Sequence, residues 1–126
     1  MNLHDYNNLS RVIDDTYGQS SSESAGAMKC FAKITGEDRM TMTCMIVVNL
    51  LNRSEMQKSK KDAESSLNSL ANDCLKNIKK DFKDLAGRAL KTKKVSSDTS
   101  VELISMSSYS PKGTALVRQV HVFEIS

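Results

Sequence analysis

A single apolar stripe at helical spacing runs from about residue 54 to residue 90. A strand changes face at every residue and cannot keep such a stripe on one side, so the spacing predicts one long helix. The stripe consists of Ala63, Leu67, Leu70, Cys74, Ile78, Phe82, Leu85 and Ala89. At about 1.5 Å per residue the helix would be on the order of 50 Å long, which exceeds the width of a compact domain of this size. It therefore needs either a broad sheet to lie on or a second copy of the chain.

The two ends of this helix carry local signals. Ser54 and Gln57 fit the capping-box pattern, with a hydroxyl at the N-cap and an amide three residues later. Gly87 lies in the last turns, where glycine is less favourable than alanine by about 1 kcal/mol. We expect the helix to continue to about Leu90. In the alternative it ends at Gly87 and residues 88–94 form a basic connector.

A shorter helix is expected over residues 1–18. Its apolar residues recur at three or four positions, and Gly18 is placed to end it in a left-handed conformation. The stripe is made of Leu3, Tyr6, Leu9, Ile13 and Tyr17. The serine-rich residues 19–25 then form a polar connector.

Period-two alternation predicts two hairpins. The first joins strands over 27–35 and 40–48 through a turn at 36–38, and its second strand becomes apolar on both faces, which favours a central position in a sheet. The second hairpin joins 101–108 to 115–125 through the turn signal at 110–113. In the last strand Val117, Gln119 and His121 share one side with Phe123 and Ile125.

These elements predict one α+β domain over residues 1–126. The order is helix, hairpin, long helix, hairpin, with a four-stranded antiparallel sheet and the long helix packed on one face.

Positive charge is concentrated on the long helix and the residues after it. Residues 56–94 contain eleven Lys or Arg and five Asp or Glu, although the whole chain carries only +3. Lysines on an amphipathic helix usually form its solvated face. The alternative is a surface for phosphate or an acidic partner. That candidate anion or nucleic-acid patch comprises Lys76, Lys79, Lys80, Lys83, Lys91, Lys93 and Lys94.

Residues for catalysis or metal binding are few. His4 and His121 are the two histidines, and no carboxylate stands at a metal-ligand spacing from either. The three cysteines, Cys30, Cys44 and Cys74, form no CxxC pair and fall on apolar faces, so free buried thiols are expected. We therefore expect no enzyme, no cofactor and no metal site.

The start of the chain has neither the basic nor the apolar region of a secretory signal, and the longest apolar run, at residues 45–51, is too short to span a bilayer. The expected location is the cytoplasm or a virion, without a membrane partner.

Two segments resemble small virion and tail-assembly proteins of tailed bacteriophages. They are NLLNRSEM (residues 49–56) and YSPKGTALVRQVHVFEIS (residues 109–126). The resemblance implies a non-enzymatic subunit of a ring or tube, whose neighbours join through sheet edges and helices. It transfers no functional residue.

A structural or assembly protein that acts as a homo-oligomer is the leading hypothesis, because a monomer would struggle to cover both the long helix and the two-sided apolar strands. The partner would be another copy or another assembly subunit. The candidate interface residues are Met40, Met42, Met45, Val47, Val120 and Val122. The alternative is an accessory protein that binds nucleic acid through the basic helix.

Overall fold

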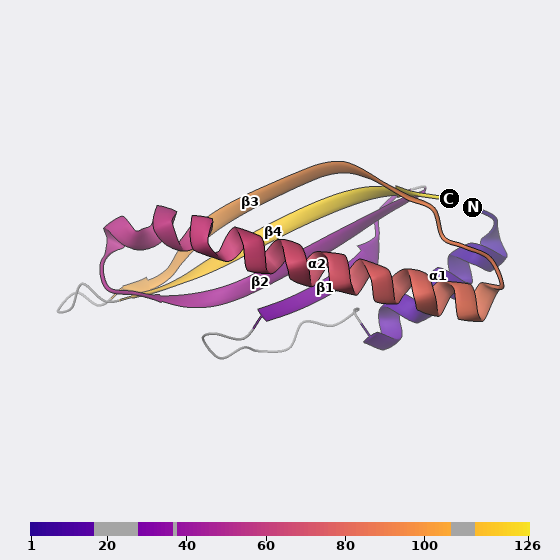
Figure 1. Cartoon of the computed structure of the whole chain (residues 1–126), viewed down its shortest axis with the longest axis horizontal. Coiled ribbons are helices and arrows are strands. Elements are labelled where there is room, and N and C mark those ends of the chain that lie inside the picture. Colours follow the sequence, from indigo (N-terminus) through magenta and orange to yellow (C-terminus); the bar gives the residue numbers. More distant parts are fainter. Residues whose placement is uncertain (17–27, 37, 107–112) are drawn as a thin grey trace.

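The computed structural model describes residues 1–16, 28–36, 38–106 and 113–126. In chain order the elements are α1 (Leu3–Thr16), β1 (Met28–Ile34), β2 (Arg39–Leu50), the 3-10 turn η1 (Arg53–Glu55), α2 (Met56–Ala86), β3 (Thr92–Met106) and β4 (Gly113–Ile125). The predicted α+β order of helix, hairpin, long helix and hairpin is confirmed (Figure 1).

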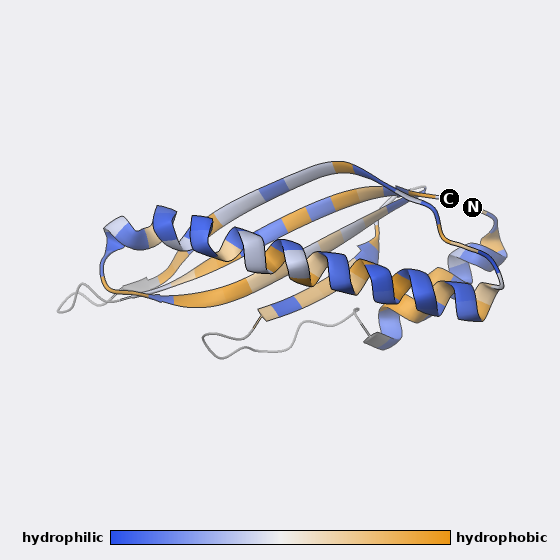
Figure 2. Cartoon of the chain, in the orientation of Figure 1, coloured by the Kyte–Doolittle hydropathy of each residue, from blue (hydrophilic) through white to orange (hydrophobic). Residues whose placement is uncertain are grey.

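The four strands form one antiparallel sheet in the order β1-β2-β4-β3. The hairpins are therefore joined side by side through β2 and β4, and β1 and β3 are the edges. The predicted central position of β2 is confirmed. Its second half is hydrophobic over consecutive residues (Figure 2), so both faces of this strand carry apolar side chains.

The helix α2 lies across one face of the sheet, and most of its residues are hydrophilic because only one stripe meets the strands (Figures 1 and 2). The buried stripe of α2 comprises Ala63, Leu67, Ala71, Cys74, Ile78 and Phe82. It packs on a layer of sheet residues that includes Ala32, Met40, Met42, Cys44, Val117, Phe123 and Ile125. This helix–sheet interface is the core of the protein.

The length of α2 is matched by the sheet of its own chain. The helix has 31 residues, which gives it a length of about 46 Å. The longest strand, β3, has 15 residues and spans about 50 Å. The helix therefore needs no second copy to cover its apolar stripe, and its length no longer argues for an oligomer.

The favoured end of the long helix near Leu90 and the predicted capping box are wrong, and the alternative end at Gly87 is confirmed. The helix stops at Ala86 because Gly87 adopts a left-handed conformation (φ 75°) and donates its N–H to the carbonyl of Lys83. At the start, Glu55 is the N-cap and makes no side-chain cap bond. Ser54 bonds Asn52 instead, and the Glu55 carboxylate accepts from the backbone N–H of Leu51 at 2.8 Å. The capping box is thus replaced by a tight turn.

The short helix α1 lies on the same side of the sheet as α2 and joins the core through Leu9, Val12 and Ile13. The side chains of Leu3 and Tyr6, which were expected on its apolar stripe, are exposed. Tyr17, Gly18 and the connector 19–25 lie outside the described residues.

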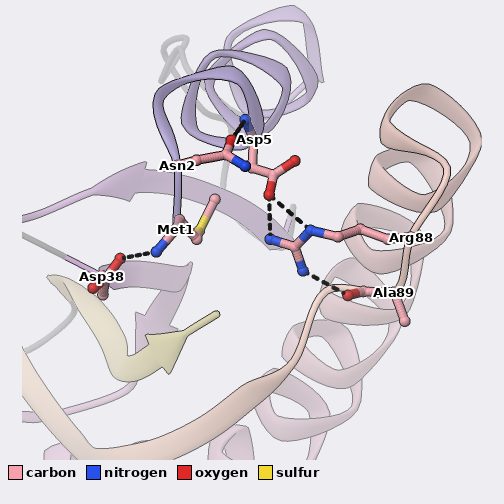
Figure 3. Close-up of polar contacts among 6 residues, drawn as sticks. All are labelled: Met1, Asn2, Asp5, Asp38, Arg88 and Ala89. Atoms are coloured by element: carbon pink, nitrogen blue, oxygen red, sulfur yellow. Dashed lines mark hydrogen bonds and ion pairs between the residues drawn. The ribbon is translucent and has the colours of Figure 1, made fainter.

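Polar contacts cap α1 and attach it to its surroundings (Figure 3): the Met1 ammonium group lies 3.0 Å from Asp38 Oδ1 in the turn between β1 and β2. The Asn2 side chain caps its first turn by accepting the Asp5 N–H at 2.8 Å. The carboxylate of Asp5 then accepts two bonds of 2.7 Å from the guanidinium of Arg88, just beyond the end of α2. Arg88 also lies 5.2 Å above the ring of Phe82. One side chain thus links α1, α2 and the core.

The edge strand β3 begins at Thr92, nine residues before the predicted start of the third strand at Val101. Residues 92–100 are polar and carry almost no apolar alternation, so the pattern gave no strand signal. They nevertheless form a strand because β4 offers them backbone partners up to Ile125, in a ladder interrupted by a register shift between Lys94 and Ser96. The predicted turn at 110–113 lies outside the described residues except for Gly113.

Candidate self-association surface

One face of the sheet is covered by α1 and α2, and among the described residues no helix or strand covers the other. We call this other side the open face. Its centre is carried by β2 and β4, and its central side chains are all half-buried: Thr43, Met45, Val47, Leu116, Arg118, Val120 and Val122. Phe31 of β1 extends the centre, because it stands opposite Thr43 and thus in one row with Val120. The result is a largely apolar surface that meets water in the isolated chain.

The edges of the open face carry opposite charges. On β1, Lys29 and Lys33 stand on the same side as Phe31, two residues away in each direction. On β3, Asp98 stands opposite Val120 and Glu102 opposite Leu116, so both carboxylates belong to the open face. The open face is therefore apolar in the middle and basic along β1, and along β3 it carries the acidic Asp98 and Glu102 together with Lys93 near the start of the strand.

The structure divides the six candidate interface residues between the two faces. Met45, Val47, Val120 and Val122 lie on the open face and are half-buried. Met40 and Met42 were assigned to the interface wrongly: both are 0% exposed and pack under the helices. The error follows from β2 being apolar on both sides, which leaves the sequence without a sign of which side the helices cover.

The charged edges were missed at the sequence level. The signal for the basic edge was present, since two lysines flank Phe31 at a spacing of two. The acidic edge falls in residues 92–102, most of which carry no strand pattern. Moreover, only the strand order places β1 and β3 at opposite edges of the sheet.

The seven candidate anion-binding lysines do not form one surface. Lys76, Lys80 and Lys83 are exposed on α2, and Lys79 is half-buried beside them. Lys93 and Lys94 are neighbours in β3 and point to opposite faces of the sheet. Lys94 lies on the helix side, 5.9 Å above the ring of Phe123. A smaller patch of the four helix lysines remains.

A row of polar side chains crosses the helix side of the sheet beneath α2. His121 and Gln119 of β4 are almost fully buried there. Ser97 Oγ lies 3.1 Å from His121 Nδ1, and His121 Nε2 lies 2.8 Å from Gln119 Oε1. Gln119 Nε2 in turn donates to Thr99 Oγ1 at 3.2 Å. Because the Gln119 amide nitrogen is directed to Thr99, its oxygen accepts from His121 Nε2–H, and His121 Nδ1 accepts from Ser97.

Burial lowers the pKa of His121, and the nearby positive charge of Lys94 lowers it further. The imidazole is therefore neutral at neutral pH, and each ring nitrogen has a hydrogen-bond partner. This arrangement satisfies a polar group inside the core, as expected for a structural histidine.

No group of His, Cys, Asp or Glu side chains among the described residues could hold a metal ion. Of the helices in the described part of the chain, none is long and apolar enough to cross a membrane. Comparison with family models, curated proteins and solved structures finds no match to this chain.

Proposed function

We propose that this chain is a non-enzymatic structural subunit that assembles with copies of itself through the open face. The observation that carries the proposal is the apolar centre of that face, which in a single chain meets solvent on the side opposite the helices. A second copy placed there would form a sandwich of two sheets between two layers of helices, in which apolar side chains interdigitate about 10 Å apart.

The charged edges select one orientation of the two copies. A two-fold axis parallel to the strands turns the β1 edge of one copy over the β3 edge of the other. Asp98 of the second copy then lies level with Phe31, two residues along the strand from both Lys29 and Lys33, and Glu102 lies two residues beyond the level of Lys29, at both edges of the interface. An axis across the strands would instead place β1 over β1, with lysines facing lysines. Complementary charge therefore favours the first arrangement, in which the same surface serves both copies.

The size of the open face suits a stable dimer. Strands of 7, 12, 13 and 15 residues, at about 3.3 Å per residue and about 4.8 Å between strands, give a face of roughly 700 Å². Interfaces of standard size bury about 800 Å² on each partner. Larger assemblies, such as the ring or tube of a phage virion or tail, would need additional contacts at sheet edges or helices. That further step is supported by the resemblance of residues 49–56 and 109–126.

Mass photometry and sedimentation at micromolar concentration test the proposal. The wild-type chain is expected to be a dimer or a multiple of one. Val120→Lys places a charge in the centre of the open face and should yield monomers with unchanged circular dichroism. Leu85→Lys is the matched control, since Leu85 is 43% exposed on α2, away from the open face. A wild-type monomer at these concentrations would refute the proposal.

The exposed lysines of α2 support a second candidate function, binding of nucleic acid through phosphate contacts. Four lysines lie within residues 76–83, close enough to contact neighbouring phosphates. Binding of duplex DNA or RNA should then weaken steeply between 50 and 200 mM salt, on the order of tenfold or more. The triple variant Lys79→Glu, Lys80→Glu, Lys83→Glu should abolish it. Absence of a gel shift at low salt would exclude this function.

A further inference from the structure

The three cysteines, which are far apart in the sequence, meet in the core between α2 and the sheet. Cys30 of β1 stands directly opposite Cys44 of β2 in the antiparallel ladder. Cys74 comes from the buried stripe of α2 and belongs to the core cluster that contains Cys44 and against which Cys30 packs. All three are free thiols; Cys44 and Cys74 are buried, and Cys30 is partly exposed on the edge strand.

The backbone at Cys30 and Cys44 already has the spacing of a disulfide. Opposite residues of an antiparallel pair have their Cα atoms about 4.5 or 5.5 Å apart, depending on the type of pair. Disulfides span Cα separations of about 4.4–6.8 Å. Both cysteines also lie on the helix side of the sheet, so their Cβ atoms point the same way. A bond between them requires side-chain rotation without displacement of a strand.

Cys74 is less suitable as the partner of Cys30. Its Cα belongs to the helix layer, which stands further from the sheet than two neighbouring strands stand from each other. A Cys30–Cys74 bond would therefore pull α2 towards β1, whereas the cross-strand bond leaves both layers in place.

We propose that Cys30 and Cys44 form a reversible cross-strand disulfide that fastens the edge strand β1 to β2. The oxidant is a small-molecule disulfide, and the reaction is thiol–disulfide exchange. In the first step the Cys30 thiolate attacks the small disulfide, which creates a mixed disulfide on Cys30 and releases one small thiolate. In the second step the Cys44 thiolate attacks Cys30 Sγ and releases the other. Two protein thiols are oxidised, and one small disulfide is reduced to two thiols.

The surroundings of the pair are consistent with both steps. Cys30 is the one partly exposed thiol of the three, so it can carry the mixed disulfide. Met28 and Ile46, two residues from Cys30 and Cys44 in their strands, line an open groove of about 340 Å³ between β1, β2 and α2. Interaction between the two thiols raises the pKa of Cys30, so the first step uses its minor thiolate fraction, and lowers the pKa of Cys44, which favours Cys44 as the thiolate of the second step.

Equilibration of the folded protein in glutathione buffers tests the proposal. Samples are quenched in acid, denatured, alkylated with N-ethylmaleimide and analysed by intact mass and peptide mapping. With oxidised glutathione in excess, the chain should accept one alkyl group, at Cys74, and the peptides of Cys30 and Cys44 should be joined. Dithiothreitol should restore three alkylated cysteines. The oxidised form should also melt at a higher temperature than the reduced form.

Single variants identify the bond. Cys74→Ala should still form the disulfide, whereas Cys30→Ala and Cys44→Ala should stop at a mixed disulfide or remain reduced. Circular dichroism checks that each variant is folded; if Cys44→Ala is not, the edge-strand variant Cys30→Ala alone decides. The proposal is overturned if Cys30 and Cys44 of the wild-type chain are both alkylated after equilibration with excess oxidised glutathione. It is also overturned if a Cys30–Cys74 disulfide is the main product. The bond lies on the helix side, so either outcome leaves the test of the open face unaffected.

Discussion

His121 shows how a single residue restricts the conditions under which the fold is stable. Its side chain lies in the core with both ring nitrogens hydrogen-bonded, and its pKa is lowered by burial and by Lys94. In the unfolded chain the same imidazole titrates near its ordinary value of about 6.5. Below that pH the unfolded state takes up a proton that the folded state does not.

The free energy of unfolding should therefore be constant above about pH 7 as far as His121 is concerned. As the pH decreases from about 6.5 to the lower pKa of the folded state, the free energy of unfolding should decrease by up to about 1.4 kcal/mol per pH unit. Urea denaturation over a pH series measures this slope. His121→Gln should flatten it, whereas the matched variant His4→Gln, at an exposed site on α1, should keep it. An unchanged slope in His121→Gln would contradict this role.

Arg88 has an importance that its place in a short connector does not suggest. Its guanidinium bonds the Asp5 carboxylate, whose side chain is only 11% exposed. Arg88→Ala would leave that carboxylate poorly solvated and without its charged partner, which should reduce the free energy of unfolding by about 1–3 kcal/mol. Hydrogen exchange should accelerate in α1 more than in the sheet. In an Asp5→Asn background, Arg88→Ala should reduce the free energy of unfolding by less. An equal reduction in both backgrounds would argue against the ion pair.

At the scale of elements, Gly87 determines where α2 ends. No heavy atom lies within 4 Å of the position that a Cβ would occupy there, so only the left-handed backbone opposes a side chain. Gly87→Ala should lower the free energy of unfolding by about 1–2 kcal/mol. Gly87→Asn should cost less, because asparagine tolerates this conformation. Chemical denaturation of the three proteins measures the difference. Equal stability of Gly87→Ala and wild type would contradict the assigned cap.

The elements differ in how far the sequence predicts them, and the reason is burial. β1, β2 and β4 alternate in sequence between the two sides of the sheet, and in β4 and the first half of β2 one side is buried, so the approximate limits of these strands were predictable. The first half of β3 packs little apolar surface, and its strand conformation is imposed by β4. The end of α2 depended on choosing between a tolerated and a terminating glycine, which local sequence does not decide.

The candidate site depends on information of longer range than any single element. Alternation shows that β2 and β4 are apolar on both sides, but the side covered by the helices is set by packing. Met40 and Met42 were therefore grouped with Met45 and Val47, although they lie on opposite faces. The opposite charges of Lys33 and Asp98 indicate complementary edges only once the strand order is known, because that order places one residue on each edge of the open face.

At the scale of the whole molecule, the proposed two-fold axis predicts charge pairs that can form only between two chains. Lys33 and Asp98 lie three strands apart, about 14 Å at a strand spacing of 4.8 Å, so they do not pair within one sheet. Across the proposed interface Lys33 and Asp98 of the other copy lie on facing edges, two residues apart along the strand, and this occurs twice. Lys33→Glu should then place carboxylates opposite Asp98, and Asp98→Lys should place two lysines opposite each other. Each variant alone should dimerise about 10-fold or more weakly than wild type, because like charges repel across the interface.

Mixing the two variants should restore assembly. In the mixed dimer the carboxylate introduced by Lys33→Glu faces the ammonium group introduced by Asp98→Lys, and the unchanged Lys33 and Asp98 face each other at the opposite edge. Native mass spectrometry with one variant isotopically labelled distinguishes this heterodimer from both homodimers, and the effect should diminish in high salt. If the axis instead ran across the strands, the β1 edges of the two copies would face each other. The carboxylate introduced by Lys33→Glu would then lie among the lysines of a wild-type β1 edge, so mixing with wild type would restore assembly without Asp98→Lys. If Lys33→Glu forms a heterodimer with wild type as readily as with Asp98→Lys, the orientation proposed here is excluded.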